Sequence, residues 1–178
     1  DAVVAEGCEA GGHIGELTTM VLVPQVVDAV KIPVIAAGGI ADGRGMAAAF
    51  MLGAKAVQLG TVFVTTEESQ VHENYKKAII KAKDIDSRVT GRTTGHPVRA
   101  LRNQMTKKYL ELEKSGAGFE ELLTLGGLRK AVVDGDVVNG SVMAGQSAAM
   151  VKEVMNCHDL IRKLVRETEE CFGRKYYE

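Results

Sequence analysis

The feature that most constrains how this chain can fold is a unit that recurs three times along its first half. Each unit has a short apolar stretch, a turn that contains glycine and a stretch with helical periodicity. Strands that alternate with helices in this way pair in parallel, and a parallel sheet needs helices to cover its faces. The sequence therefore predicts an α/β fold.

The first unit begins with residues 2–5, an apolar run typical of a buried strand, followed by a polar, glycine-rich run over 6–15. A helical stripe comes next, formed by Val23, Val26, Val27 and Val30. Pro24 lies within this stripe, so we expect the helix to carry it in its first turn, where a missing N–H group is tolerated.

The second unit has a strand at 32–37, a turn at Gly38-Gly39 and a helix over 46–52. The expected start and stop signals of that helix are Asp42 and Gly53.

The third unit has a strand at 56–59 and a turn at Gly60-Thr61. Residues 65–68 form a capping-box pattern, which predicts a helix start directly after them.

The rest of the chain is predicted to be mainly helical after one further strand at 87–90. A helical segment covers about 97–133, with an approximate stripe at Val98, Leu101, Met105 and Leu112, and terminal helices cover about 146–172. No low-complexity linker divides the chain, so we take residues 1–178 as one portion of a single domain. Three or four parallel strands are too few to close a barrel, which needs eight strands and about 250 residues.

Charge and composition exclude several classes of protein. The chain has 22 Lys and Arg against 23 Asp and Glu, a net charge of −1, which argues against nucleic-acid or membrane-surface binding through bulk positive charge. It has neither a signal-peptide pattern nor an apolar run of about 18 residues. Its three cysteines have no metal-ligand or disulfide spacing, which favours a reducing compartment, with the cytoplasm as the default.

The glycine turns are the first candidate binding elements. Glycine makes up 20 of the 178 residues, or about 11%, against roughly 7% in average proteins. The turns Gly38-Gly39 and Gly60-Thr61 would each present backbone N–H groups at the carboxyl end of a strand, where a phosphate can bind. The alternative is that each glycine only relieves a tight turn.

His13 is the candidate catalytic residue, because it lies in a glycine-flanked loop and could donate or accept a proton near neutrality. The alternative is a capping or surface histidine. Glu6 and Glu9 could orient the loop or a ligand, or be solvated, whereas His72, His96 and His158 are taken as structural.

Residues 139–146 form a small, flexible segment that could let a flat cofactor approach the backbone, or could be a plain connector. The chain has no G-x-S-x-G motif, P-loop lysine, zinc-ligand spacing or G-x-G-x-x-G motif, which removes support for serine hydrolases, nucleotide triphosphatases and dinucleotide folds of that type.

Four motifs in order carry a resemblance to a known family: 9–15 with 17–20, then 32–43, 58–61 and 140–146. Together they resemble the nitronate monooxygenase superfamily of FMN-dependent barrels, and within it the flavin-dependent enoyl-acyl carrier protein reductases of type II. The resemblance runs over nearly the whole chain.

The resemblance implies a TIM-type (β/α)8 barrel, of which this chain is the carboxy-terminal portion plus a helical extension. The family's amino-terminal half, which completes the flavin site, is expected to be missing, because the chain opens on an apolar run with no initiator Met. The implied cofactor is FMN, with NADH or NADPH as reductant and a possible monovalent cation. The implied partners are acyl carrier protein and a second copy in a homodimer.

The reaction implied by the resemblance is reduction of FMN by NADH or NADPH and hydride transfer to the β-carbon of a trans-2-enoyl thioester on acyl carrier protein. His13 would act there as proton donor or orienter. The implied cofactor-binding residues are Glu6, Gly11, Gly12, Gly38, Gly39, Gln58, Gly60, Thr61, Ser141, Met143 and Ala144.

Two other functions stay open at this point. A nitronate monooxygenase would use the same histidine as a base toward a nitroalkane, with oxygen reoxidising the flavin, although residues 14–20 favour the reductase. A non-catalytic half-barrel is the alternative of another class.

Overall fold

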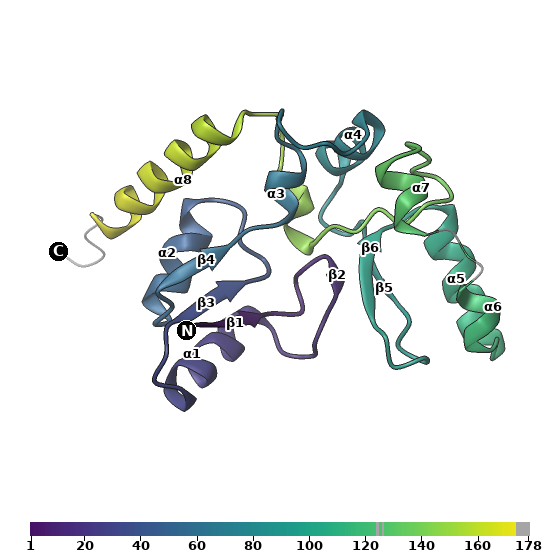
Figure 1. Ribbon diagram of the computed structural model, residues 1–178, viewed down its shortest axis with the longest axis horizontal. Helices are drawn as coiled ribbons and strands as arrows, with labels where there is room; N and C mark the ends of the chain where they lie inside the picture. The colour runs from purple at the N-terminus through teal and green to yellow at the C-terminus, as the bar shows by residue number, and fades with distance from the viewer. Residues whose placement is uncertain (124, 126, 174–178) are drawn as a thin grey trace.

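The computed structural model describes residues 1–123, 125 and 127–173. Its strands are β1 (Val3–Glu6), β2 (Gly12–His13), β3 (Val34–Ala37), β4 (Ala56–Gln58), β5 (Ser87–Thr90) and β6 (Val98–Leu101). Its helices are α1 (Thr19–Ala29), α2 (Gly43–Met51), α3 (Thr61–Val64), α4 (Glu73–Lys81), α5 (Gln104–Ser115), α6 (Phe119–Leu123), α7 (Leu128–Val132), the 3-10 helix η1 (Gln146–Met150) and α8 (Cys157–Phe172). Figure 1 shows their arrangement.

The three repeated units form the parallel sheet that the sequence predicts. Its strand order is β1-β3-β4, with Ala5 beside Ala36 and Ala36 beside Val57. Helices α1 and α2 cover one face, where Val23 and Ala49 pack with the strands in a buried core. The α/β class is therefore confirmed.

The opposite face of this sheet is only partly covered. Val4, Ile35 and Ala56 lie side by side in register on that face. Val4 is 45% exposed and Ala56 is also exposed. Burying such apolar side chains would contribute about 25 cal/mol per Å², so this face is suited to contact with further protein.

A second sheet runs antiparallel, with strand order β2-β6-β5. The predicted strand at 87–90 is confirmed as β5, but the helical prediction is wrong for 98–101, which form β6. Val98 and Leu101 do fit helical spacing, yet their backbone pairs with β5 and β2. Long-range pairing overrides the local pattern here, as it commonly does for short apolar runs.

The helix after β6 starts at a local signal. Asn103 and Thr106 form a capping box, in which the Asn103 side chain accepts from the Thr106 N–H and the Thr106 hydroxyl accepts from the Asn103 N–H. Helix α5 therefore begins at Gln104, seven residues into the predicted helical segment, because two of its free N-terminal donors are satisfied there.

Three smaller predictions are corrected. Pro24 lies in the second turn of α1, not the first, because the carboxylate of Glu9 accepts from the Thr19 N–H and starts the helix early. Residues 65–68 do not cap a helix: the hydroxyls of Thr65 and Thr66 donate to preceding carbonyl oxygens, and α4 starts only at Glu73.

The third correction concerns the terminal helices, which are interrupted at 151–156. Asn156 caps α8 by accepting from the Asp159 N–H. Helix α8 packs along α2 (Figure 1). The Thr168 hydroxyl donates to the Gly43 carbonyl oxygen. Of the described helices, none is both long enough and apolar enough to cross a bilayer.

Candidate functional site

A cavity of about 230 Å³ lies at the carboxyl ends of β1, β3 and β4. This is the end at which parallel α/β sheets bind ligands. It is lined by Glu6, Ala10, Gly11, Gly12, Ala37, Gly38, Gly39, Ile40, Gln58, Gly60, Thr61, Val64, Met143, Gly145 and Ser147. We call this space the glycine-turn cavity.

Most of the predicted cofactor-binding residues line the glycine-turn cavity, although they come from four separate segments of the chain. The predicted residues outside its lining are His13, Ser141 and Ala144. Ala37 and Ile40, which do line it, flank the predicted turn and could have been found from that position alone.

Two of the predicted glycine turns line this cavity. The amide N–H groups of Gly38, Gly39, Gly60 and Thr61 donate no hydrogen bond to any described residue. Backbone amides that line a cavity without a protein partner are suited to an anion. The two predicted turns are thus brought together with their donors free.

The glycines of these turns differ in what they require. Gly38 and Gly39 have φ angles of +88° and +71°, which L side chains rarely adopt, and a Cβ at Gly38 would lie 2.6 Å from the Gly7 carbonyl oxygen. Gly60 has a φ of −101° and open space within 4 Å of its Cβ position. Gly60 therefore leaves room that the protein itself does not fill.

The start of α2, by contrast, is closed to an anion. The Gly43 N–H donates to Glu167 Oε2 and the Gly45 N–H to Asp42 Oδ1, both at 3.0 Å. Desolvation works to raise the pKa of Asp42, but hydrogen bonds from Arg44 and Gly45 outweigh it and the pKa is lowered overall. An anion at this site would thus be held by the turn amides rather than by the α2 terminus.

The glycine-rich loop lies against the segment around Ala144. A Cβ at Gly11 would lie 2.6 to 2.8 Å from backbone atoms of Ala144 and Gly145. The Gln146 N–H donates to the Glu9 carbonyl oxygen at 2.8 Å. Ala144 is 1% exposed, so its contribution is this backbone contact. Ser141 is buried away from the cavity, and its role toward a cofactor stays a prediction.

Met143 is held at the cavity wall by a buried tyrosine. The Tyr75 hydroxyl donates to the Met143 carbonyl oxygen at 2.7 Å, and burial raises the pKa of Tyr75. The neighbouring Gly145 N–H donates to Thr61 Oγ1 at 2.9 Å. The late segment is thereby joined to the third glycine turn.

His13 follows Gly12 in β2 and its side chain is exposed. Glu6 ends β1, and partial burial raises the pKa of its carboxyl. Gln58 ends β4 in the same row of the sheet as Glu6. The cavity therefore has titratable and amide side chains at its strand ends and an imidazole beside its glycine loop.

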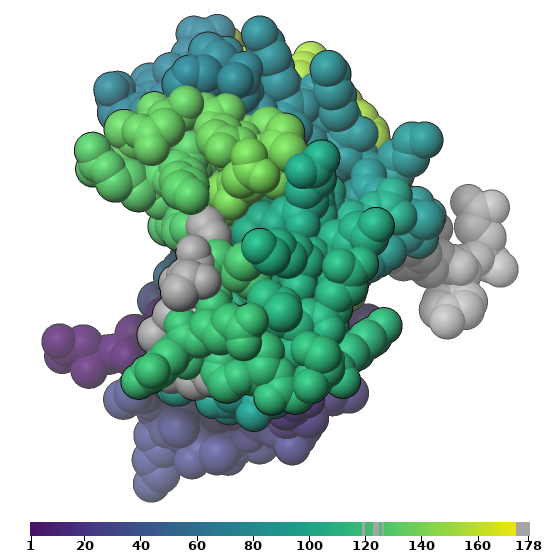
Figure 2. Space-filling model, turned by 90° about the vertical axis from the view of Figure 1, so that its right-hand side faces the viewer, coloured from purple at the N-terminus to yellow at the C-terminus, as the bar shows by residue number. Residues whose placement is uncertain are grey.

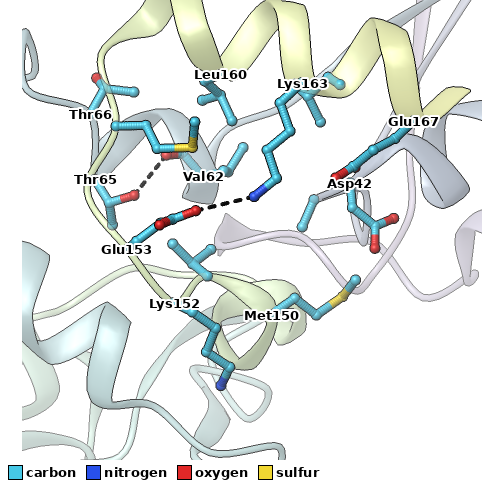
Figure 3. Close-up of a pocket in the computed structure, with 14 residues that line it drawn as sticks. Asp42, Val62, Thr65, Thr66, Met150, Lys152, Glu153, Leu160, Lys163 and Glu167 are labelled. Atoms are coloured by element: carbon cyan, nitrogen blue, oxygen red, sulfur yellow. Dashed lines mark hydrogen bonds and ion pairs between the residues drawn. The ribbon is translucent and has the colours of Figure 1, made fainter.

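A second cavity, of about 200 Å³, lies between α8, η1 and α3 (Figure 3). The Lys163 ammonium and the Glu153 carboxylate form an ion pair across it at 3.2 Å. None of the predicted site residues lines this cavity. Within the described residues, no group of three or more His, Cys, Asp or Glu side chains could hold a metal ion.

Residues 1–167 match the family model described as "Nitronate monooxygenase". The chain belongs to the nitronate monooxygenase family. Among proteins of known structure, it is 52% identical to FabK from Thermotoga maritima, with a TM-score of 0.93 over 97% of this chain and 55% of that one. FabK is a TIM-barrel protein, so the predicted barrel-type fold is confirmed for the matched part.

Two further family relatives carry other names. A nitroalkane oxidase from Streptomyces ansochromogenes is 33% identical, with a TM-score of 0.77 over 97% of this chain and 52% of that one. A "Probable nitronate monooxygenase" from Staphylococcus saprophyticus is 39% identical over 98% of this chain and 52% of its own length. This chain thus spans about half of each relative, and all three are oxidoreductases.

Proposed function

We propose that this chain takes part in the FMN-dependent reduction of a trans-2-enoyl thioester on acyl carrier protein, with NADH or NADPH as reductant. The observation that carries the FMN assignment is the set of amides at Gly38, Gly39, Gly60 and Thr61, which line one cavity and have no hydrogen-bond partner among the described residues. FabK is an enoyl-acyl carrier protein reductase of type II. The 52% identity of this chain to FabK is higher than its 33% identity to the nitroalkane oxidase, which supports the reductase branch.

The residues present fit the phosphate of FMN. A phosphate has several strong acceptor oxygens and carries negative charge, which unpaired amides stabilise. The open space at Gly60 would be filled by the bound group, and the closed start of α2 leaves the turn amides as its donors. When bound, FMN would supply hydride transfer.

The protein's own residues would then orient the substrate and move a proton. The net reaction adds a hydride to the β-carbon and a proton to the α-carbon of the enoyl thioester, while the nicotinamide is oxidised. His13 is the proposed proton donor or orienting group, because it lies beside the glycine loop that lines the cavity. Gln58 and Glu6 are the proposed polar contacts at the strand ends.

The rest of the site is proposed to come from additional protein. Complete ligand pockets measure roughly 300 to 1,000 Å³, whereas the glycine-turn cavity measures about 230 Å³. One face of the parallel sheet is partly uncovered beside it, with Val4 45% exposed. We propose that the portion of the family's barrel that this chain does not match covers this face. The homodimer, the monovalent cation and the cytoplasmic location also stay predictions.

The second candidate function is nitronate oxidation, favoured by the names of the Staphylococcus saprophyticus and Streptomyces ansochromogenes relatives. In that reaction His13 would remove a proton from a nitroalkane and oxygen would be the final oxidant. The two functions differ in their need for NADH or NADPH, since only the reductase requires it.

The cofactor assignment is tested by a fluorescence titration of FMN into the Gly60→Val variant. A Cβ at this position meets no atom within 4 Å and the φ is negative, so the fold should be kept. FMN affinity should fall at least about tenfold, because the side chain would occupy the phosphate space. The matched control is Gly127→Val, which also has open space and a negative φ of −77° but lies outside the cavity. Equal FMN affinity in both variants would remove the assignment.

The two functions are separated by anaerobic mixing of the FMN-loaded protein with NADH or NADPH. The reductase should show rapid bleaching of flavin absorbance, which then recovers on addition of a trans-2-enoyl thioester. Bleaching by a nitroalkane, with no reaction toward reduced nicotinamide, would favour the monooxygenase instead.

A further inference from the structure

One buried side chain fixes the glycine-rich loop between β1 and β2. Arg99 lies in β6 and is 6% exposed. Its Nε and one terminal nitrogen donate to the Cys8 carbonyl oxygen at 3.1 and 2.8 Å, and its other terminal nitrogen donates to Ser87 Oγ at 3.0 Å. These bonds connect the antiparallel sheet directly to the loop of the parallel sheet.

The backbone around the same residue holds the other end of the loop. Arg99 is the strand partner of Gly12, and Val98 is the partner of His13. The Ile14 N–H also donates to the Pro97 carbonyl oxygen at 3.1 Å. The segment from Cys8 to His13 is therefore tied at both ends to one short stretch of β6.

The charge of Arg99 has no carboxylate partner: no described carboxylate lies within 4.0 Å of its guanidinium. Burial lowers the pKa of Arg99, but arginine stays protonated in proteins. A buried cation that bonds only to neutral acceptors is costly to maintain. Arginine offers in return a fixed, planar set of N–H donors, which a compact neutral side chain could not supply.

We propose that Arg99 is a positioning residue for His13. It sets the distance between the glycine-rich loop and β6, and so fixes the backbone that carries the imidazole next to Gly12, which lines the glycine-turn cavity. This inference rests on the proposed function of His13. A lysine at 99 would keep the charge but has a single nitrogen, which cannot reproduce both donors to Cys8 and the bond to Ser87.

The first test is a double-mutant cycle in the FMN-loaded enzyme, with turnover of an enoyl thioester expressed per bound FMN. Arg99→Ala should lower kcat by about 10- to 100-fold, the scale of a catalytic group displaced by about 1 Å. Arg99→Lys should recover part of this loss. In a His13→Ala background, Arg99→Ala should change kcat less than about twofold, because the two residues act as one unit. Equal losses in both backgrounds would overturn the inference.

The second test needs neither cofactor nor activity. Hydrogen exchange of the amides from Cys8 to Ile14 should become at least about tenfold faster in Arg99→Lys, while the amides of α2 keep their protection. The matched control is Arg102→Lys, just beyond β6, whose guanidinium makes an exposed ion pair with Asp86 at 3.1 Å. That control should leave the loop unchanged.

These readouts separate the two proposals. Unchanged exchange in Arg99→Lys would overturn the inference about Arg99 even if His13 proves essential. Faster exchange together with normal turnover of His13→Ala would refute the proton role of His13 and with it the positioning role, while the FMN assignment would still stand on its own titration.

Discussion

The parallel and antiparallel sheets build the same site by different means. In the parallel sheet, the Gly38-Gly39 and Gly60-Thr61 turns offer backbone donors with no partner among the described residues. In the antiparallel sheet, the Arg99 guanidinium donates three hydrogen bonds to Cys8 and Ser87 of the protein itself. The comparison teaches that the parallel sheet leaves backbone donors open at its strand ends, whereas the antiparallel sheet uses side-chain donors to hold the glycine-rich loop. Figure 2 shows a face of the molecule on which green and teal later segments lie toward the viewer, with the purple first segment projecting at the edge.

The largest expected effect concerns the partly uncovered face of the parallel sheet. Residues 1–178 alone should associate and bind FMN weakly, because edge strands and exposed apolar side chains promote association. Co-expression with the part of the Thermotoga maritima protein that this chain does not match should restore FMN binding and enoyl reduction. Size-exclusion chromatography measures the association, and the visible spectrum measures bound FMN. A monomer of 19.0 kDa with stoichiometric FMN would contradict this.

The next effect tests whether chemistry depends on the loop held by the antiparallel sheet. His13→Ala in the FMN-loaded enzyme should lower turnover of an enoyl thioester by about 100-fold or more, the scale of general acid catalysis, while FMN stays bound. His158→Ala, on the exposed start of α8, is the control. Turnover within a factor of two of the original would show that the assigned role is wrong.

A smaller effect is expected where the glycine-rich loop contacts the segment around Ala144. Gly11→Ala should destabilise the fold by about 1 to 3 kcal/mol, because its methyl group would meet the backbone of Ala144 and force overpacking. Urea denaturation measures the change. Gly15→Ala has open space and serves as the control. Equal stability of the two variants would mean that the loop and the Ala144 segment are not in tight contact.

The smallest expected effect concerns the cap of helix α2, which covers the parallel sheet. Its contribution to stability depends on pH. Asp42→Ala should cost about 1 kcal/mol of unfolding free energy at neutral pH, the usual value of a helix cap. The folded-state pKa of Asp42 is lowered, so the cap's contribution is present above the unfolded-state pKa and is lost as pH falls through the folded-state pKa. The two proteins should therefore converge in stability toward acid pH, and a constant difference would contradict the assignment.

The sequence predicted the parallel sheet well because its signals are local. Asp42 and Gly53 were expected as the start and stop signals of α2, and the structure has Asp42 as its cap and Gly53 at a φ of +100° just after it. The antiparallel sheet could not be predicted in the same way, since β6 pairs with strands on either side of it in space and its apolar spacing also fits a helix. Arg99 was hidden by that error, because a helix would have placed its side chain elsewhere.

The candidate site also has a part that local sequence signals predict and a part that they do not. Glycine turns after strands predict where ligand donors gather, and the glycine-turn cavity collects most of the predicted residues. Burial cannot be read from one segment, however. Ser141 and Ala144 belong to a glycine-rich stretch, yet both are buried and neither lines the cavity. The closure of the α2 start by Glu167 is likewise a contact that no local pattern reveals, because 124 residues separate the two partners.

The hydrogen bond from Gly43 to Glu167 has a consequence for folding during synthesis. The Gly43 N–H at the start of α2 has its acceptor on Glu167, 124 residues later in the chain. A ribosome-bound chain would expose an unfinished second unit until α8 had emerged, since long-range contacts form only after both partners exist. Helix α8 therefore completes the hydrogen bonding of a unit that is translated well before it.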